Sequence, residues 1–313
     1  MRSFRFIADL SAIVDGPTLA EKARRAESIG YDEIVLGDHL LEQLAPIPAL
    51  ATVAAATERI RIGTFVLNND LRHPAVLAQD LATLDVLSGG RLEVGIGAGW
   101  NEPEYAAIGL AFDSPGRRIE RMIEGVTVLK GLLADGPFSF QGTHYAIAGL
   151  DGQPKPVQRP HPPFLMGGGG RRMLTFAARE ADTVGLAPIA TGNGPSLVED
   201  CLAAATERKI GWIREAAGDR FDRLDLNVYP AMGPVRVTDD ARREATELAH
   251  RVASRHGGDV SAGELLESPF VYIGSVDELV QKLIAARERF GINCLTAFDM
   301  EQLAPVVERL AGT

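Results

Sequence analysis

Hydrophobic and polar positions alternate along the chain in two patterns. Short runs of apolar and β-branched residues predict strands, and Ala- and Leu-rich segments with helical spacing predict helices. The expected strands are Phe4–Leu10, Glu33–Gly37, Arg59–Leu67, Arg91–Gly97, Pro163–Met166, Asp182–Leu186, Asp225–Tyr229 and Cys294–Phe298. The expected helices are Pro17–Ile29, Pro46–Glu58, Pro74–Leu87, Arg117–Leu133, Met173–Glu180, Ser196–Ala217, Asp239–His256 and Glu301–Leu310.

Strands that alternate with helices form parallel βαβ units, and eight such strands close into a (β/α)8 TIM barrel. An open doubly wound α/β sheet is the competing architecture. It is less favoured because no Gly-x-Gly-x-x-Gly motif follows the first strand. Extra helical segments within 187–276 predict an insertion late in the barrel, so 1–313 is expected to be a single domain. Residues Phe138–Ile147 are expected to form a small hairpin.

Composition narrows the range of partners. Hydrophobic residues make up 46% and charged residues 24%, as in ordinary soluble proteins. The net charge of -10 argues against nucleic acid, and no apolar run has the length of a membrane span. The two cysteines, Cys201 and Cys294, predict neither a metal site nor a disulfide framework. With no signal-peptide pattern at the start, we expect a cytoplasmic protein with a small-molecule substrate.

The most informative segment is a run of four glycines between a predicted strand and a predicted helix, followed by two arginines. Glycines let backbone N–H groups approach a ligand, and a helix N-terminus favours negative charge. An arginine adds a bidentate contact. The segment predicts a phosphate site, and the alternative is a flexible turn. The expected contacts come from Gly168, Gly169, Gly170 and Arg171.

Asp38 and His39 follow the second predicted strand. At the mouth of a barrel, a carboxylate and an imidazole can orient a substrate and move a proton. The alternative is that Asp38 caps the following helix and His39 packs passively. The residues themselves favour neither interpretation.

Two further segments lie where the barrel wall would meet a cofactor. Phe65 and Val66 lie near the end of the third strand, and Gly97-Ala98-Gly99-Trp100 follows the fourth. Small residues at Gly97 and Gly99 allow a flat ring close to the backbone, on which Trp100 could stack. The alternative is a tight loop in which Trp100 only packs. His73, before Pro74, is expected to be a helix-entry residue.

Several stretches together resemble the luciferase-like monooxygenase superfamily, in particular its deazaflavin (coenzyme F420)-dependent oxidoreductases. The resemblance covers nearly the whole chain. The matching stretches are Ile62–Val66, Arg72-His73-Pro74, Leu81–Trp100, Gly116-Arg117-Arg118, Pro154–Gln158, Gly167–Arg171 and Gly274–Leu279.

The resemblance implies a TIM barrel, usually dimeric, with a cis peptide or bulge at Phe65-Val66 against the middle ring of the cofactor. It implies that Asp38 and His39 lie near the redox centre. Some sugar-phosphate dehydrogenases of the superfamily carry a catalytic Glu where this chain has Trp100, with Glu102 nearby but offset. That departure argues against a sugar-phosphate substrate.

The expected function is hydride transfer between F420 and a small organic substrate by a homodimer. His39 would move the proton, and Asp38 would orient it or contact the ring. The alternatives are an FMN-dependent monooxygenase, a non-catalytic flavin-binding relative, or a phosphate-binding isomerase or aldolase. A Schiff-base aldolase is disfavoured because no lysine ends a predicted strand.

Overall fold

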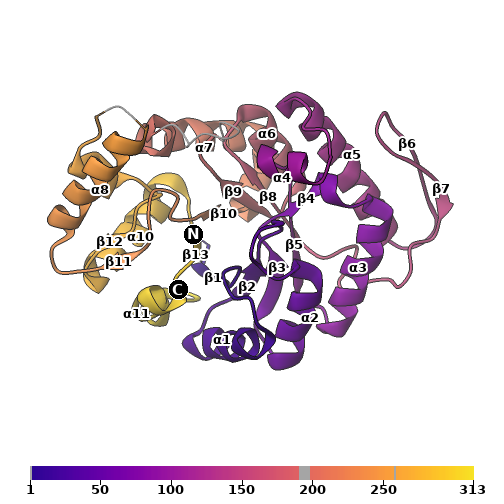
Figure 1. Ribbon diagram of the computed structural model, residues 1–313, viewed down its shortest axis with the longest axis horizontal. Coiled ribbons are helices and arrows are strands. Elements are labelled where there is room, and N and C mark those ends of the chain that lie inside the picture. The colour runs from indigo at the N-terminus through magenta and orange to yellow at the C-terminus, as the bar shows by residue number, and fades with distance from the viewer. Residues whose placement is uncertain (1, 190–197, 257–258) are drawn as a thin grey trace. The chain divides into compact units, whose positions relative to one another are not determined.

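The computed structural model describes residues 2–189, 198–256 and 259–313 (Figure 1). Within these residues, parallel strands alternate with helices, and the fold is the closed eight-stranded (β/α)8 TIM barrel that the sequence predicts. The chain forms two compact units. Unit 1 comprises Met1–Asp9, Ala26–Glu33 and Gly167–Thr313, and unit 2 comprises Leu10–Arg25 and Ile34–Met166.

Strand β5 (Leu92–Gly97) organises the sheet of unit 2. It pairs in parallel with β3 (Arg61–Thr64), β4 (Leu67–Asn68) and the first residues of β8 (Phe164–Gly168). The other elements that lie wholly in this unit are α2 (Pro46–Ala56), η1 (Asn69–Leu71), α3 (Pro74–Leu87), α4 (Glu102–Ala107), α5 (Pro115–Leu133), and the hairpin of β6 (Phe138–Gln141) and β7 (Ala146–Leu150). Strand β2 (Glu33–Leu36) and helix α1 (Gly16–Ile29) have residues in both units.

Strand β13 (Cys294–Ala297) has the same role in unit 1. It lies between β1 (Arg5–Asp9) and β10 (Asp225–Val228), and β10 pairs with β9 (Thr183–Leu186). The helices are α6 (Arg171–Glu180), η2 (Val198–Cys201), α7 (Ala203–Ala217), η3 (Gly218–Arg223), α8 (Ala241–His256), α9 (Ala262–Glu267), α10 (Val276–Phe290) and α11 (Met300–Leu310). A separate parallel pair, β11 (Arg236–Val237) and β12 (Ile273–Gly274), lies beside α8 and α10 (Figure 1).

The predicted third strand is interrupted. It divides into β3 and β4, and the peptide bond between Phe65 and Val66 in the gap is cis. The expectation of a cis peptide or bulge at this position is therefore confirmed. Elsewhere the strands β2, β5, β9 and β13 are buried along their whole length. Burial on both faces explains why their sequences are mainly apolar and do not alternate regularly between apolar and polar residues.

Among the described residues, three α-helices were not predicted: α4, α9 and α10. The start of α10 nevertheless carries a capping box, in which Ser275 and Glu278 satisfy each other's backbone N–H groups. The predicted helix at Ser196–Ala217 begins at residues outside the described ones, and its described part divides into η2 and α7. Of the described helices, none combines the length and apolar character needed to cross a bilayer.

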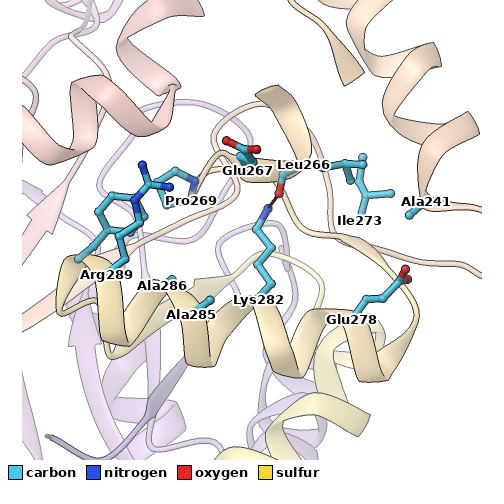
Figure 2. Close-up of a pocket in the computed structure, with 11 residues that line it drawn as sticks. Ala241, Leu266, Glu267, Pro269, Ile273, Glu278, Lys282, Ala285, Ala286 and Arg289 are labelled. Atoms are coloured by element: carbon cyan, nitrogen blue, oxygen red, sulfur yellow. Dashed lines mark hydrogen bonds between the residues drawn. The ribbon is translucent and has the colours of Figure 1, made fainter. Parts of the chain in front are cut away.

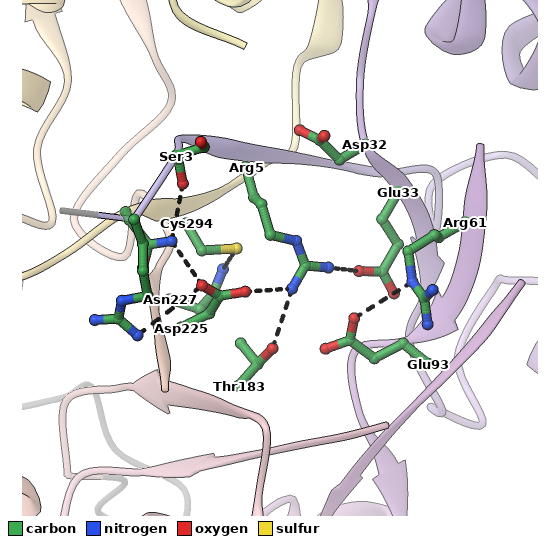
Figure 3. A network of polar contacts seen from close by, with 12 residues as sticks. Ser3, Arg5, Asp32, Glu33, Arg61, Glu93, Thr183, Asp225, Asn227 and Cys294 are labelled. Carbon is green, nitrogen blue, oxygen red and sulfur yellow. Dashed lines mark hydrogen bonds and ion pairs between the residues drawn. The ribbon is translucent and has the colours of Figure 1, made fainter. Parts of the chain in front are cut away.

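Arg5, the first residue of β1, ties several strand beginnings of unit 1 together (Figure 3). Its guanidinium donates to Glu33 Oε2 at 3.1 Å and to Asp225 Oδ2 at 2.8 Å. It also donates to Thr183 Oγ1 at 3.3 Å. Glu33, Thr183 and Asp225 open β2, β9 and β10. In TIM barrels the N-terminal ends of the strands serve stability while the opposite ends carry the chemistry, so this network is structural.

Replacing Arg5 with Leu is expected to lower the free energy of unfolding by about 3 kcal/mol, because two carboxylates lose a shared cation in a largely buried setting. Urea unfolding at neutral pH measures the change. Arg243→Ala is the control, because Arg243 is exposed and its ion pairs with Asp240 and Glu244 lie at the surface. Equal, small effects of the two substitutions would contradict a structural role for Arg5.

Candidate functional site

Asp38 lies just beyond β2 and is buried in unit 2. Both of its carboxylate oxygens accept from Arg72, at 2.6 Å to Nη1 and 2.9 Å to Nη2, and Oδ2 also accepts from the backbone N–H of Asn68 at 3.0 Å. Such a bidentate, charge-assisted contact is strong and directional. The helix that follows, α2, has Ala45 at its N-cap position and no side-chain cap. The alternative that Asp38 caps this helix is therefore wrong.

His39 has a carboxylate partner of its own. Its Nδ1 lies 3.0 Å from Oε1 and 3.1 Å from Oε2 of Glu104, which is buried on α4. The Trp100 ring meets the imidazole edge-on, with the ring centroids 5.6 Å apart. A buried carboxylate requires a hydrogen-bond donor, so Nδ1 carries the proton and Nε2 is the nitrogen left for other chemistry. The imidazole is thus held by a hydrogen bond as well as by packing, and its part in proton transfer stays a prediction.

Sequence reasoning missed two residues of this arrangement, Glu104 and Arg72. It considered Glu102, but that residue is exposed, while Glu104 two positions later reaches His39. The one available signal for Glu104 was an acidic residue in the first turn of a helix directly after Trp100. For Arg72, the family resemblance marked the position, but no residue spacing connected it with Asp38.

A second set of polar contacts anchors α4. The buried Tyr105 hydroxyl lies 3.0 Å from both Asn68 Oδ1 and Asp70 Oδ2. Arg121 contacts Asp70 twice at 2.7 Å and Asp113 at 2.8 Å. Burial first, and then the negative charge of Asp70, raise the pKa of Tyr105 above its usual range, so the hydroxyl keeps its proton and donates. The helix that carries Glu104 is thus fixed to the β4–η1 segment.

Gly97, the last residue of β5, and Gly99 lie close to other parts of unit 2. A Cβ on Gly97 would lie 2.9 Å from Val66 Cγ2, beside the cis peptide. Gly99 has φ +74°, and a Cβ there would lie 2.0 Å from the Tyr105 hydroxyl. Phe65 donates its N–H to the Leu36 carbonyl at 2.9 Å. Contacts thus connect the ends of β2, β3 and β5, and the packing of Tyr105 alone already requires glycine at position 99. The predicted stacking of a ring at these residues stays a prediction.

The glycine run lies in unit 1, where β8 ends at Gly168 and α6 begins after Gly170. The N-cap residue of α6 is Gly170, which has no side chain with which to cap the first N–H groups of the helix. A Cβ on Gly169 would lie 2.5 Å from the backbone N of Ile189, whereas a Cβ on Gly170 would meet open space. Arg171 donates to Glu215 at 3.2 Å on the surface. The loop has the form expected of an anion site, and the side chain of Arg171 has a competing partner.

A buried ion pair supports the segment against which this loop packs. Lys209 is fully buried and donates to Asp200 Oδ2 at 2.7 Å and to the Ala187 carbonyl at 2.8 Å. Asp200 Oδ2 also accepts the N–H of Ile189 at 2.6 Å. Ala187 in turn donates its N–H to the Gly168 carbonyl at 3.1 Å. The backbone around the glycine run is therefore held from inside unit 1.

Unit 1 also contains a cavity of about 350 Å³ between α10 and the chain that follows α9 (Figure 2). Its walls include Leu266, Ile273 and Phe290. None of the described residues that line it belongs to the predicted sites. Lys282 donates to the Leu266 carbonyl at 2.6 Å. Burial lowers the pKa of Lys282 to about 7, against an opposing effect of Glu267. We therefore assign Lys282 to the packing of α9 and α10.

Comparisons with known proteins define the family to which this chain belongs. The sequence model of the luciferase-like monooxygenases matches residues 4–209. The chain therefore belongs to the luciferase-like monooxygenase family. An F420-dependent glucose-6-phosphate dehydrogenase of Nakamurella multipartita is 33% identical over 230 residues, which cover 71% of this chain and 65% of that protein. The match thus spans just under two thirds of that relative's length.

Other relatives differ in cofactor. An FMNH2-dependent dimethylsulfone monooxygenase of Pseudomonas putida is 37% identical over 128 residues, which cover 41% of this chain and 35% of that protein. Among solved structures, the F420-dependent tetrahydromethanopterin reductase of Methanopyrus kandleri has a TM-score of 0.77 at 21% identity and covers 99% of both chains. That likeness supports the fold alone.

Because burial lowers the pKa of Lys282, the free energy of unfolding should depend on pH. This pKa is lowered from 10.5 to about 7 in the folded chain, so between these values the unfolded chain holds a proton that the folded chain has released. This group therefore makes stability rise with pH across that window. Lys282→Met should stabilise the protein most, relative to wild type, below about pH 7 and lose this advantage towards pH 10. Urea unfolding at several pH values measures it, and a difference that does not vary with pH would contradict the assignment.

Proposed function

We propose that the protein is an F420-dependent oxidoreductase that exchanges hydride with a small organic substrate, with His39 moving the accompanying proton. The observation that carries this proposal is the Glu104–His39 pair. A carboxylate that holds Nδ1–H fixes the ring and leaves Nε2 to give or take a proton. Support comes also from relatives whose names specify F420.

The chemistry that F420 supplies when bound is the uptake or release of hydride at a substrate carbon. The protein must then handle the proton on the substrate oxygen. In this proposal His39 Nε2 takes that proton when an alcohol is oxidised and returns it when a carbonyl is reduced. Glu104 would keep its hydrogen bond to the Nδ1–H of the ring in both directions of the reaction. Asp38 has an orienting role, because Arg72 and the Asn68 N–H already occupy its carboxylate.

The residues in the structure fit such a cofactor. Gly97 lets the backbone lie directly against Val66, and Trp100 offers a half-exposed aromatic face. The uncapped start of α6, with open space at Gly170, suits a phosphate. We therefore assign two sets of contacts. In unit 2 the ring would be held by Phe65, Val66, Gly97, Gly99 and Trp100, and Asp38 would support this set through its contacts with Arg72 and Asn68. In unit 1 a phosphate would be held by Gly168, Gly169, Gly170 and Arg171.

An FMN-dependent monooxygenase is the second candidate, favoured by the dimethylsulfone monooxygenase relative. Binding titrations with F420 and with FMN, read by the change in coenzyme fluorescence, separate the two. We expect tighter binding of F420, and turnover that continues without oxygen. Preference for FMN with oxygen consumption would overturn the proposal. Binding of either coenzyme without any turnover would favour a non-catalytic relative. The homodimer, the single domain and the cytoplasmic location stay predictions.

Replacing His39 with Ala should leave F420 affinity nearly unchanged and lower kcat by roughly 10²–10⁴-fold, the usual contribution of a positioned acid or base. His73→Ala is the matched control, because His73 caps α3 by accepting the Ala75 N–H. It should lose some stability and keep its turnover. Glu104→Leu adds a readout without activity: nitrogen NMR should show that the Nδ1–H form of His39 no longer dominates. An unchanged tautomer in that variant would contradict the role of Glu104.

Replacing Gly169 with Ala should weaken F420 binding by roughly tenfold, about 1.4 kcal/mol. The new Cβ would meet backbone atoms of Pro188 and Ile189 within 2.7 Å, so the loop must shift. Gly211→Ala is the matched control in the same unit, because a Cβ there meets open space on α7. Coenzyme titration and thermal unfolding of both variants measure the effect. A Gly169→Ala protein that binds F420 as tightly as wild type does would remove the loop from the proposed phosphate site.

A further inference from the structure

The segments of unit 2 that carry or contact His39 expose several large apolar side chains. Leu40 and Leu41 follow His39 directly and are 54% and 65% exposed. Trp100 contacts the imidazole edge-on and is 50% exposed. Ile108, also 50% exposed, follows Glu104 by four residues and donates its N–H to the Glu104 carbonyl, so it lies on the same side of α4. We call Leu40, Leu41, Trp100 and Ile108 the apolar rim.

Charge beside His39 does not suit an anion. The charged group in contact with the imidazole is the Glu104 carboxylate. The arginines of the neighbouring networks already form ion pairs, Arg72 with Asp38 and Arg121 with Asp70. Recognition of a phosphate calls for cationic or N–H donors that are not spent on other acceptors. An apolar ligand, in contrast, gains about 25 cal/mol for each Å² of apolar surface that it removes from water.

We infer that the substrate that meets His39 is an uncharged, mainly apolar alcohol or carbonyl compound held by the apolar rim, and not a phosphorylated sugar. This inference rests on the proposed function and specifies its substrate class. It separates this chain from the relative named for glucose 6-phosphate. The polar end of such a substrate would lie at His39 Nε2, and its apolar part would cover Trp100 and its neighbours.

The chain provides its own reporter for a binding test. It contains two tryptophans, Trp100 and Trp212, and Trp212 lies on α7. In a Trp212→Phe variant, emission therefore reports on Trp100 alone. We would titrate this variant with a homologous series of methyl ketones and with glucose 6-phosphate, with and without F420. The matched control is Trp100→Phe, in which Trp212 is the remaining tryptophan.

Each added methylene should tighten ketone binding about fourfold, which corresponds to about 0.8 kcal/mol per buried methylene. The Trp100 emission should change with ketone and stay constant with glucose 6-phosphate, and the control should respond to neither. Ile108→Ser should weaken the binding of long ketones more than that of short ones.

Two failures are distinguishable. Saturable binding of glucose 6-phosphate at Trp100, or ketone affinity that does not vary with chain length, would overturn this inference while leaving F420 dependence intact. Lack of F420 binding would overturn the proposed function, and the Trp100 titration without F420 would still decide whether the rim binds apolar ligands.

Discussion

The candidate site depends on one buried carboxylate. Asp38 cannot be desolvated at the end of β2 without compensation, and Arg72 and the Asn68 N–H supply it. These contacts tie the end of β2 to β4 and η1. Because His39 is the next residue, the position of its ring follows from the same constraint. Glu104 then sets which nitrogen of that ring carries the proton. Two separate carboxylates thus set the position of the imidazole and its tautomer.

Glycine has several functions around the sites. Gly99 adopts a left-handed conformation and leaves room for the Tyr105 hydroxyl, which belongs to the support of α4. Gly169 leaves room for the backbone at Ile189, which the Lys209–Asp200 pair holds in place. Gly170, in contrast, faces open space. A glycine-rich loop is therefore not by itself a sign of a ligand. Of Gly99, Gly169 and Gly170, Gly170 is the one at which a Cβ would meet no atom within 4 Å among the residues that the structure describes.

Membership of the luciferase-like monooxygenases limits the chemistry without choosing a coenzyme, because relatives of both the F420 and the FMN kind match this chain. The residues specific to this chain add the finer distinctions. A Glu–His pair suits proton transfer coupled to hydride exchange. Trp100, where sugar-phosphate relatives are expected to carry a carboxylate, is an exposed apolar side chain, as are Leu40 and Ile108. The same fold can thus serve a different class of substrate, since function depends on the site and not on the barrel.

The sequence by itself determined the barrel. Strands of a parallel sheet are buried on both faces, so they are mainly apolar and can be recognised between the helical segments. The local sequence also predicted that His73 lies at the start of α3. The family resemblance predicted the cis peptide bond between Phe65 and Val66. Only the tertiary structure decided the partners within the site. Asp38 meets Arg72 across 34 residues, and His39 meets Glu104 across 65. Side chains from the ends of separate strands come together only when the barrel closes. A local sequence pattern therefore does not predict which basic side chain will contact which carboxylate.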